Sequence, residues 1–178
     1  MIQPTQQALD ALQIALKLEL DSVAFYQEAT KKAQNQLGKE TFASLIKEEL
    51  GHIEIVKKAY TSISGANSWD EIAPLLPKTI DPNKKTIFQI KKQEIDQKLD
   101  PNSDDMKALK TAIGIESEGC KFYEKSAQET TDPIGKKMYE YLKGEENRHW
   151  ELLQNTYEYL SDPSLWFAKE EHHIYDGG

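Results

Sequence analysis

The stretch KEELGHIE, residues 47–54, places three glutamates and one histidine within a short segment of the chain. A second stretch, GEENRHWE at residues 144–151, keeps the same Glu-Glu-x-x-His-x-Glu spacing. A single Glu-x-x-His on a charged helix is usually a solvated surface feature, so one copy alone would carry little information. The repetition is therefore the feature from which we interpret the fold.

The similarity between the two stretches continues toward the N-terminus of each. When residues 11–54 are aligned without gaps to residues 108–151, 13 of the 44 positions are identical. The identical pairs include Glu19/Glu116, Phe25/Phe122, Tyr26/Tyr123, Gly38/Gly135, Glu49/Glu146 and His52/His149. Repeats of solenoid proteins are much shorter, about 20–50 residues. The pattern therefore indicates an internal duplication of one structural unit.

Each copy of the duplicated unit predicts a pair of helices joined by a turn. Apolar residues recur near helical spacing in both copies, and Gly38 is expected in the first turn. Asp132 and Pro133 suit the N-cap and the first position of the last long helix. The predicted helices span about residues 5–34, 39–62, 104–130 and 133–160.

Residues 63–103 connect the two hairpins and contain four prolines. They predict a short helix near Trp69 and a longer one at about residues 84–98. A connection of this length allows the two hairpins to lie in parallel, as in bundles with a long crossover. We therefore predict one all-α domain over residues 1–178, a four-helix bundle. Its parts are the hairpin repeats at about residues 5–62 and 104–160, the crossover at about 63–103 and a tail at 161–178 that buries Trp166 and Phe167.

The composition excludes several classes of protein. A formal net charge of −8 argues against nucleic-acid binding, which needs clustered Lys and Arg. No apolar run approaches the ~20 residues of a membrane span, and the first residues lack the pattern of a secretory signal. The single cysteine, Cys120, excludes an intrachain disulfide and any Cys-x-x-Cys metal site within this sequence. We expect a soluble, cytoplasmic protein that binds neither nucleic acid nor a membrane.

The duplicated pattern predicts a metal site with two ions. Residues three apart on a helix lie on one face, so Glu49 with His52, and Glu146 with His149, can each point at one place. At ~1.5 Å per residue, Glu19 and Glu116 stand at a similar height on the partner helices of their hairpins. Four buried carboxylates repel each other unless cations lie between them. Carboxylate and imidazole ligands without thiolates suit iron or manganese. The predicted metal ligands are Glu19, Glu49, His52, Glu116, Glu146 and His149.

Other polar residues near this pattern receive separate interpretations. Tyr26 and Tyr123 each follow the single Glu of their helix by seven residues and are expected to hydrogen-bond a ligand carboxylate of a neighbouring helix. The alternative is that they are aromatic core residues. Cys120 corresponds to Val23 of the first copy, which favours a buried apolar role. The residues interpreted as exposed to water are Glu48, Glu54, Glu145, Glu151, His172 and His173.

These motifs resemble those of rubrerythrin-like proteins of the ferritin-like superfamily. The resemblance rests on ALKLELDSVAFYQEA with KEELGHIEIV and on AIGIESEGCKFYEKSA with GEENRHWELL, and it covers most of the chain. It implies a ferritin-like bundle with two iron ions, manganese being the alternative. By this resemblance Glu49 and Glu146 would bridge the ions, and Glu19 and Glu116 would be terminal ligands. His52 and His149 would each hold one ion.

The sequence departs from the family pattern in two places. Rubrerythrins carry a rubredoxin domain with four cysteines, which this sequence cannot form. They also usually carry a further carboxylate three residues after the Glu of the third helix, where this chain has Gly119, whose counterpart in the first copy is Ser22. The metal movement associated with that carboxylate is therefore not carried over to this chain.

The resemblance implies an oxidoreductase that reduces hydrogen peroxide, or less efficiently dioxygen, at a dinuclear site. Its expected partners are that oxidant, an external electron donor such as a rubredoxin, and a second copy of the chain in a homodimer. One alternative is an iron-oxidising, iron-handling protein like the ferritins. Another is a scaffold or sensor in which the metals are only structural.

Overall fold

The computed structural model describes residues 4–66, 68–76, 99–101 and 103–175, and in α-helices it leaves the side chains of residues 4–5, 66 and 170–175 undescribed. The predicted helix at 84–98 therefore lies outside the described residues. The same holds for the side chains of His172 and His173.

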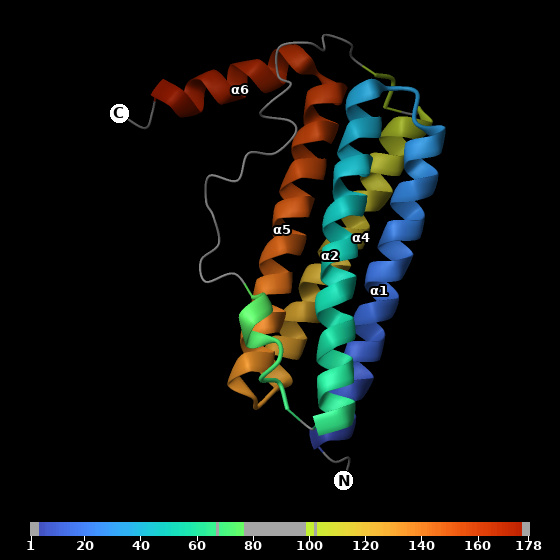
Figure 1. Cartoon of the computed structure of the whole chain (residues 1–178). Helices are drawn as coiled ribbons and strands as arrows, with labels where there is room; N and C mark the ends of the chain where they lie inside the picture. Colours follow the sequence, from blue (N-terminus) through green and yellow to red (C-terminus); the bar gives the residue numbers. More distant parts are fainter. Residues whose placement is uncertain (1–3, 67, 77–98, 102, 176–178) are drawn as a thin grey trace.

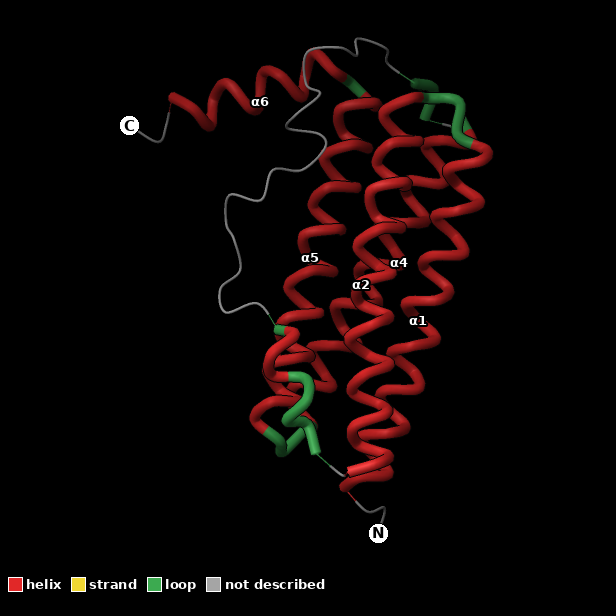
Figure 2. Tube along the Cα trace, viewed as in Figure 1, coloured by secondary structure: helices red, strands yellow, loops and turns green. Residues whose placement is uncertain are grey.

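The described part of the chain is almost entirely helical and contains no strand (Figure 2). None of its helices combines the length and the apolar character that crossing a membrane requires. The elements are α1 (Pro4–Lys32), α2 (Gln36–Ala66), the 3-10 helix η1 (Ala73–Leu75), α4 (Asp104–Glu129), α5 (Pro133–Ser161) and α6 (Pro163–Tyr175).

The four long helices form the bundle that the sequence predicts (Figure 1). Helix α1 packs along α2 and α4 along α5, which gives two antiparallel hairpins. Between the hairpins, α1 contacts α4 and α2 contacts α5. Helices α2 and α4 run in the same direction, so the chain must return along the bundle between them. The expected ferritin-like, all-α architecture is confirmed.

In both hairpin turns a side-chain oxygen caps the helix that follows, but the first turn ends earlier in the sequence than predicted. Asp132 accepts hydrogen bonds from the backbone N–H groups of Ile134 and Gly135, which caps α5 as expected. At the equivalent place Asn35 accepts a hydrogen bond from the N–H of Gly38 at 3.0 Å. Helix α2 therefore begins at Gln36, and the expectation that Gly38 lies in the turn is wrong.

Two apolar clusters fill the bundle, one toward each end. One contains Tyr26, Phe42, Leu109 and Leu153, and the tail joins it through Trp166. The other contains Leu12, Val56, Tyr123 and Leu142, among others. On each long helix the predicted metal ligands lie in sequence between residues of the first cluster and residues of the second. The bundle therefore has a polar layer in its middle, closed at both ends by apolar side chains.

The tail forms α6, which follows α5 at one end of the bundle and projects to the side, away from the other helices, in Figure 1. Trp166 is buried and Phe167 is half-buried, and both rings pack edge-on against Tyr159 at the end of α5. The predicted return of the tail onto the bundle is therefore observed for these two side chains.

Candidate metal centre

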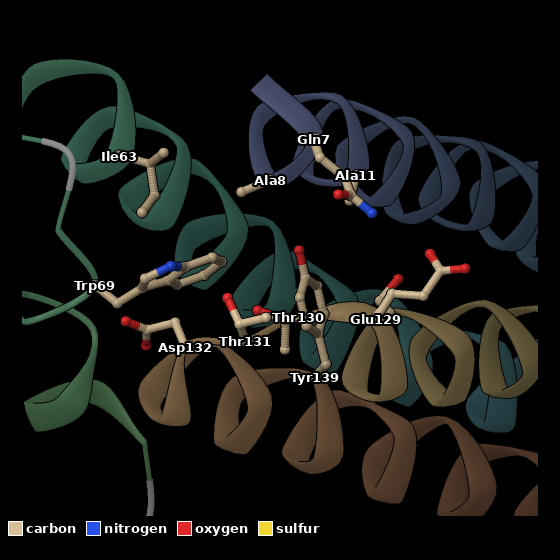
Figure 3. Close-up of a pocket in the computed structure, with 11 residues that line it drawn as sticks. Gln7, Ala8, Ala11, Ile63, Trp69, Glu129, Thr130, Thr131, Asp132 and Tyr139 are labelled. Carbon is tan, nitrogen blue, oxygen red and sulfur yellow. The ribbon is translucent and has the colours of Figure 1, made fainter. Parts of the chain in front are cut away.

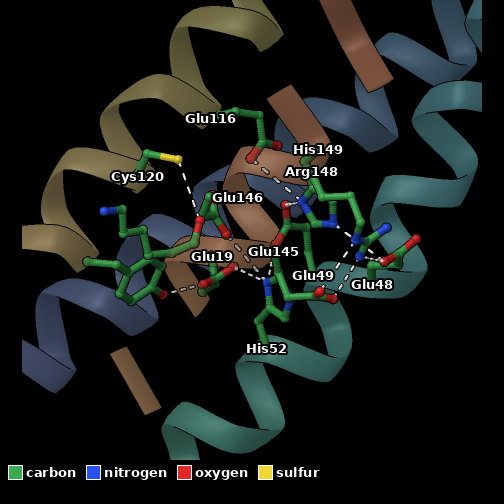
Figure 4. A network of polar contacts seen from close by, with 12 residues as sticks. Glu19, Glu48, Glu49, His52, Glu116, Cys120, Glu145, Glu146, Arg148 and His149 are labelled. Atoms are coloured by element: carbon green, nitrogen blue, oxygen red, sulfur yellow. Dashed lines mark hydrogen bonds and ion pairs between the residues drawn. The ribbon is translucent and has the colours of Figure 1, made fainter. Parts of the chain in front are cut away.

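The six predicted ligands meet in the middle of the bundle, one or two from each long helix (Figure 4). Each is between 0 and 4% exposed, although four of them are glutamates. Charged groups are rarely buried this completely without a partner of opposite charge. The six site residues are Glu19, Glu49, His52, Glu116, Glu146 and His149.

These residues form two overlapping groups of four. In one, ligand atoms of Glu19, Glu49, His52 and Glu146 lie within 4.8 Å of one another, and in the other Glu116 and His149 replace Glu19 and His52. Glu49 and Glu146 belong to both groups. This is the geometry of two adjacent cation positions that share two carboxylates.

The histidines face the shared carboxylates with the same ring nitrogen. His52 Nδ1 lies 2.9 Å from Glu49 Oε2, and His149 Nδ1 lies 3.2 Å from Glu49 Oε1. The two imidazoles stack, with ring centroids 5.4 Å apart and an angle of 17° between the planes. The duplicated halves therefore place equivalent groups on the two sides of one small volume.

Two inner carboxylate oxygens show that this volume suits metal ions. Glu116 Oε2 and Glu146 Oε1 are buried and accept no hydrogen bond from the described residues; each faces the Nδ1 atom of one imidazole, His149 at 3.6 Å and His52 at 3.5 Å. Leaving a buried carboxylate oxygen without a hydrogen bond is costly. A divalent cation between the two groups would satisfy both oxygens, and a mixed carboxylate and imidazole set without thiolates is typical of iron or manganese. The residues present therefore fit a dinuclear metal site.

The electrostatics of the metal-free site point the same way. Burial raises the pKa of Glu19 to about 7, and burial with the neighbouring carboxylates raises that of Glu146 well above its usual range. Burial alone would lower the pKa of His52 and His149, but the carboxylates around them raise both well above the usual value. The pKa of Glu49 is well below its usual range despite burial, because both imidazoles contact it. Protons thus supply positive charge that metal ions can replace.

Comparison with known proteins identifies the family. The rubrerythrin family profile matches residues 10–157, which include all six site residues. The chain belongs to the rubrerythrin family. No curated protein matches it significantly. Among solved structures, a hypothetical protein from Pyrococcus furiosus shares the fold with a TM-score of 0.63 and 21% sequence identity, over 86% of this chain and 89% of that one.

Two tyrosines of this rubrerythrin-family chain hydrogen-bond, across the bundle, the two glutamates that each belong to only one of the groups of four. Tyr26 on α1 donates to Glu116 Oε1 on α4, and Tyr123 on α4 donates to Glu19 Oε1 on α1. Both phenols are buried, and burial together with these carboxylates raises the pKa of each well above its usual value. Both therefore remain protonated donors. The contacts follow the duplication and hold the two hairpins in register at the site.

The expectation that Glu145 is exposed is wrong, and Glu48 is only partly exposed. Glu145 is 7% exposed and accepts hydrogen bonds from Arg148 at 2.7 and 3.3 Å; Arg148 also pairs with Glu48. Glu145 Oε2 lies 4.0 Å from His52 Nε2, and Glu48 Oε2 lies 3.5 Å from His149 Nε2. Both carboxylates therefore flank the outer side of an imidazole.

The duplication indicates that a carboxylate lies beside the outer nitrogen of each site histidine. Both copies keep a Glu directly before the ligand Glu, at positions 48 and 145. Metal-binding histidines commonly direct their second nitrogen toward a carboxylate, which orients the ring. Arg148 has no counterpart, since the first copy has Gly51, so the duplication gave no indication of it. Glu54 and Glu151 are exposed, as predicted.

Cys120 lies beside the site without joining it. Its side chain is half-buried, and its Sγ lies 3.6 Å from the backbone oxygen of Lys143 (Figure 4). Burial and the nearby Glu146 and Glu116 carboxylates raise the pKa of its thiol to about 11. The thiol is therefore protonated at neutral pH and is not a thiolate ligand.

A pocket of about 320 Å³ near the α4–α5 turn contains none of the six site residues (Figure 3). Figure 3 shows the phenol of Tyr139 directed into it, between Trp69 and Ala11. The Tyr139 ring packs between those of Trp69 and Tyr123, at centroid distances of 6.0 and 6.3 Å. This pocket is therefore separated from the metal centre by aromatic packing.

Proposed function

We propose that this rubrerythrin-family chain is a non-haem di-iron oxidoreductase that reduces hydrogen peroxide, or less efficiently dioxygen, with electrons from an external donor. The observation that carries the proposal is the pair of buried four-residue groups that share Glu49 and Glu146. A site with two adjacent cation positions suits a reaction that transfers two electrons. In it, one hydrogen peroxide takes up two electrons and two protons, its O–O bond breaks, and two waters form.

The six site residues would act as shared or as single ligands of two iron ions. Glu49 and Glu146 lie in both groups and would bridge; Glu19 with His52, and Glu116 with His149, would complete one position each. When bound, the ferrous ions supply the two electrons and stabilise developing negative charge on oxygen.

The surroundings of the site support this chemistry. The apolar clusters on both sides of the site surround its six buried side chains, and this low-dielectric environment strengthens electrostatic interactions among them. Tyr26 and Tyr123 fix the orientation of the terminal carboxylates by donating to them. Glu48 and Glu145 lie on the outer side of the imidazoles and favour the ring orientation in which Nδ1 faces the site.

A metal analysis tests the site. Protein purified without oxygen is expected to contain two iron ions per chain, with manganese as the alternative. Glu49→Ala and Glu146→Ala should lose most of this metal because each removes a shared carboxylate. Glu54→Ala is the matched control, since Glu54 lies in the same stretch and is exposed. Unchanged metal content in both site variants would reject the site.

Stopped-flow oxidation tests the reaction. The reduced, iron-loaded protein is mixed with hydrogen peroxide or with dioxygen, and oxidation of the centre is followed by absorbance. The proposal requires faster oxidation by peroxide. Oxidation by dioxygen that is equally fast or faster would remove the peroxidase assignment and favour the iron-handling alternative.

The proposed partners are an external donor such as a rubredoxin and a second copy of the chain in a homodimer. Storage of iron, as in ferritins, needs a closed multimeric shell. Size-exclusion chromatography with light scattering separates these cases, because a dimer cannot form a cage.

A further inference from the structure

A pocket of about 530 Å³ opens between α1 and α4 at the level of the metal centre. Its inner wall includes Glu19, Glu146 and Tyr123, that is, two site residues and the phenol that donates to one of them. Its lining also includes the apolar side chains of Leu18 and Ile115. This pocket therefore connects the surface with one of the two cation positions.

Gly119 makes this approach to the centre possible. A Cβ atom at position 119 would lie 2.4 Å from Glu146 Oε2, closer than real Cβ contacts. Only glycine therefore lets the Glu146 carboxylate lie against α4 at the inner end of the pocket. The equivalent residue of the first copy is Ser22, so the two halves differ where the pocket meets the site.

The size and charge of the pocket indicate what enters it. Hydrogen peroxide is little larger than water, which occupies about 30 Å³ in the liquid. Pockets of about 300–1,000 Å³ are typical of sites for small organic molecules. Asp21 and Glu118 in the lining are paired with Lys17 and Lys121, which lie outside it, whereas the inner carboxylates, Glu19 and Glu146, have no lysine or arginine beside them in the lining. An uncharged molecule with an apolar body fits these walls better than an anion does.

We propose that the α1–α4 pocket admits uncharged organic hydroperoxides and presents their O–O bond to the site at Glu19 and Glu146. This inference rests on the proposed function. One hydroperoxide, ROOH, takes up two electrons from the reduced centre and two protons from water, its O–O bond breaks, and ROH and water form. The external donor then restores the two electrons. The apolar R group lies between Leu18 and Ile115.

Gly114→Phe adds an aromatic side chain to the lining of this pocket at a position that is not one of the six site residues. Gly114 lines the pocket, is exposed, and has no atom within 4 Å of the place its Cβ would take. Gly65→Phe is the matched control, because Gly65 is an exposed helical glycine with equally open surroundings and lies outside the pocket lining.

Binding is measured first, on metal-free protein, by NMR titration with 2-phenyl-2-propanol, the alcohol that corresponds to cumene hydroperoxide. We expect binding to the unmodified protein and to Gly65→Phe. In Gly114→Phe it should weaken at least about tenfold, a loss of about 1.4 kcal/mol. Absence of binding to the unmodified protein would overturn the inference, and so would equal binding to both variants. A changed oligomeric state of Gly114→Phe would assign the groove to a subunit interface and would overturn it too.

Oxidation of the reduced, iron-loaded protein is measured second, with cumene hydroperoxide and with hydrogen peroxide. In Gly114→Phe the rate with cumene hydroperoxide should fall at least about tenfold, while the rate with hydrogen peroxide stays close to that of the unmodified protein. Oxidation of the unmodified protein by hydrogen peroxide alone would overturn the inference and leave the proposed function standing. Failure of both oxidants would overturn the proposed function, and the inference with it.

Discussion

The hydrogen bonds from Tyr26 to Glu116 and from Tyr123 to Glu19 allow a test at the scale of single residues. We predict that Tyr123→Phe and Tyr26→Phe each weaken metal binding about 10- to 100-fold, the usual effect of removing a group that orients a ligand. The phenylalanine keeps the ring and its packing, so only the donor to Glu19 or Glu116 is lost. Competition with a chelator of known affinity measures the change.

Tyr139→Phe is the control for both tyrosine variants. The Tyr139 hydroxyl is buried but has no hydrogen-bond partner among the described residues, and the equivalent residue of the first copy is Phe42. Its removal should leave metal affinity unchanged. Equal effects of all three substitutions would show that the two hydrogen bonds do not support the ligands.

At the same scale, the sequence predicted which residues meet at the site but not all of their environment. The six site residues were recognisable because the duplication repeats them and because a helix rises by a fixed distance per residue. The burial of Glu145 could not be recognised in the sequence, since a charged residue on a charged helix is usually exposed. Glu145 pairs with Arg148 one turn along α5 and lies next to His52 of α2. The second is a contact between helices, which spacing along one helix cannot show.

At the scale of the helices, Gly135 at the start of α5 packs closely against Trp69, which lies at the beginning of the connection between the two hairpins. A Cβ atom at this position would lie 2.9 Å from Cε2 of Trp69. We predict that Gly135→Ala displaces Trp69 and lowers the free energy of unfolding by about 1–3 kcal/mol, the usual cost of overpacking. Urea denaturation measures the loss, and Trp fluorescence reports the displacement.

Gly38→Ala is the control for this variant, because Gly38 is the equivalent residue of the first copy. Its added Cβ would meet Asn35 Oδ1 at 3.9 Å, an ordinary contact. Since alanine favours helices more than glycine does, Gly38→Ala should be neutral or stabilise by up to about 1 kcal/mol. Equal effects at both positions would contradict the role of Trp69.

Asp105 gives a second test at this scale, because it ties the first residues of α4 to the α1–α2 turn. Its carboxylate is buried and accepts hydrogen bonds from the backbone N–H groups of Gln34 and Asn35, the latter at 2.6 Å. Asp105→Ala would leave both donors unpaired, at a cost of about 1–3 kcal/mol each. Asp104→Ala, at an exposed neighbouring position in the same helical turn, should cost less than about 1 kcal/mol. Urea midpoints of the two variants give the comparison.

The helices themselves were predictable from apolar spacing and caps, but the way they meet was only partly so. Asp132 and Pro133 marked the start of α5 correctly. The N-cap role of Asn35 was missed, because Gly38 three residues later looked like the turn residue. Contacts such as Asp105 with Gln34 join residues far apart in sequence, and the repeat gives no counterpart for them, since the residue equivalent to Asp105 is Ala8.

At the scale of the whole molecule, the metal centre couples folding to pH. In the metal-free protein the pKa of Glu19 is raised to about 7, and those of Glu146, His52 and His149 are raised well above their usual values. Folded protein therefore holds more protons than unfolded protein near neutral pH. Each of these groups stabilises the fold most at low pH, and this contribution is lost as the pH rises. Glu49 acts in the opposite direction, but its lowered pKa matters only below the ordinary value of 4.5.

We therefore predict that the metal-free protein becomes less stable between about pH 5 and pH 8, by about 1.4 kcal/mol per pH unit for each additional proton held by the folded state. The metal-loaded protein should show the opposite slope from about pH 5 to 6.5, because bound metal keeps the imidazoles deprotonated while the unfolded chain protonates its own. Urea denaturation without oxygen, at several pH values with and without iron, measures both slopes. Parallel slopes would mean that the six buried groups do not exchange protons for metal. In that case the polar layer would be a structural network of ion pairs, and the bundle would not depend on metal ions for its charge balance.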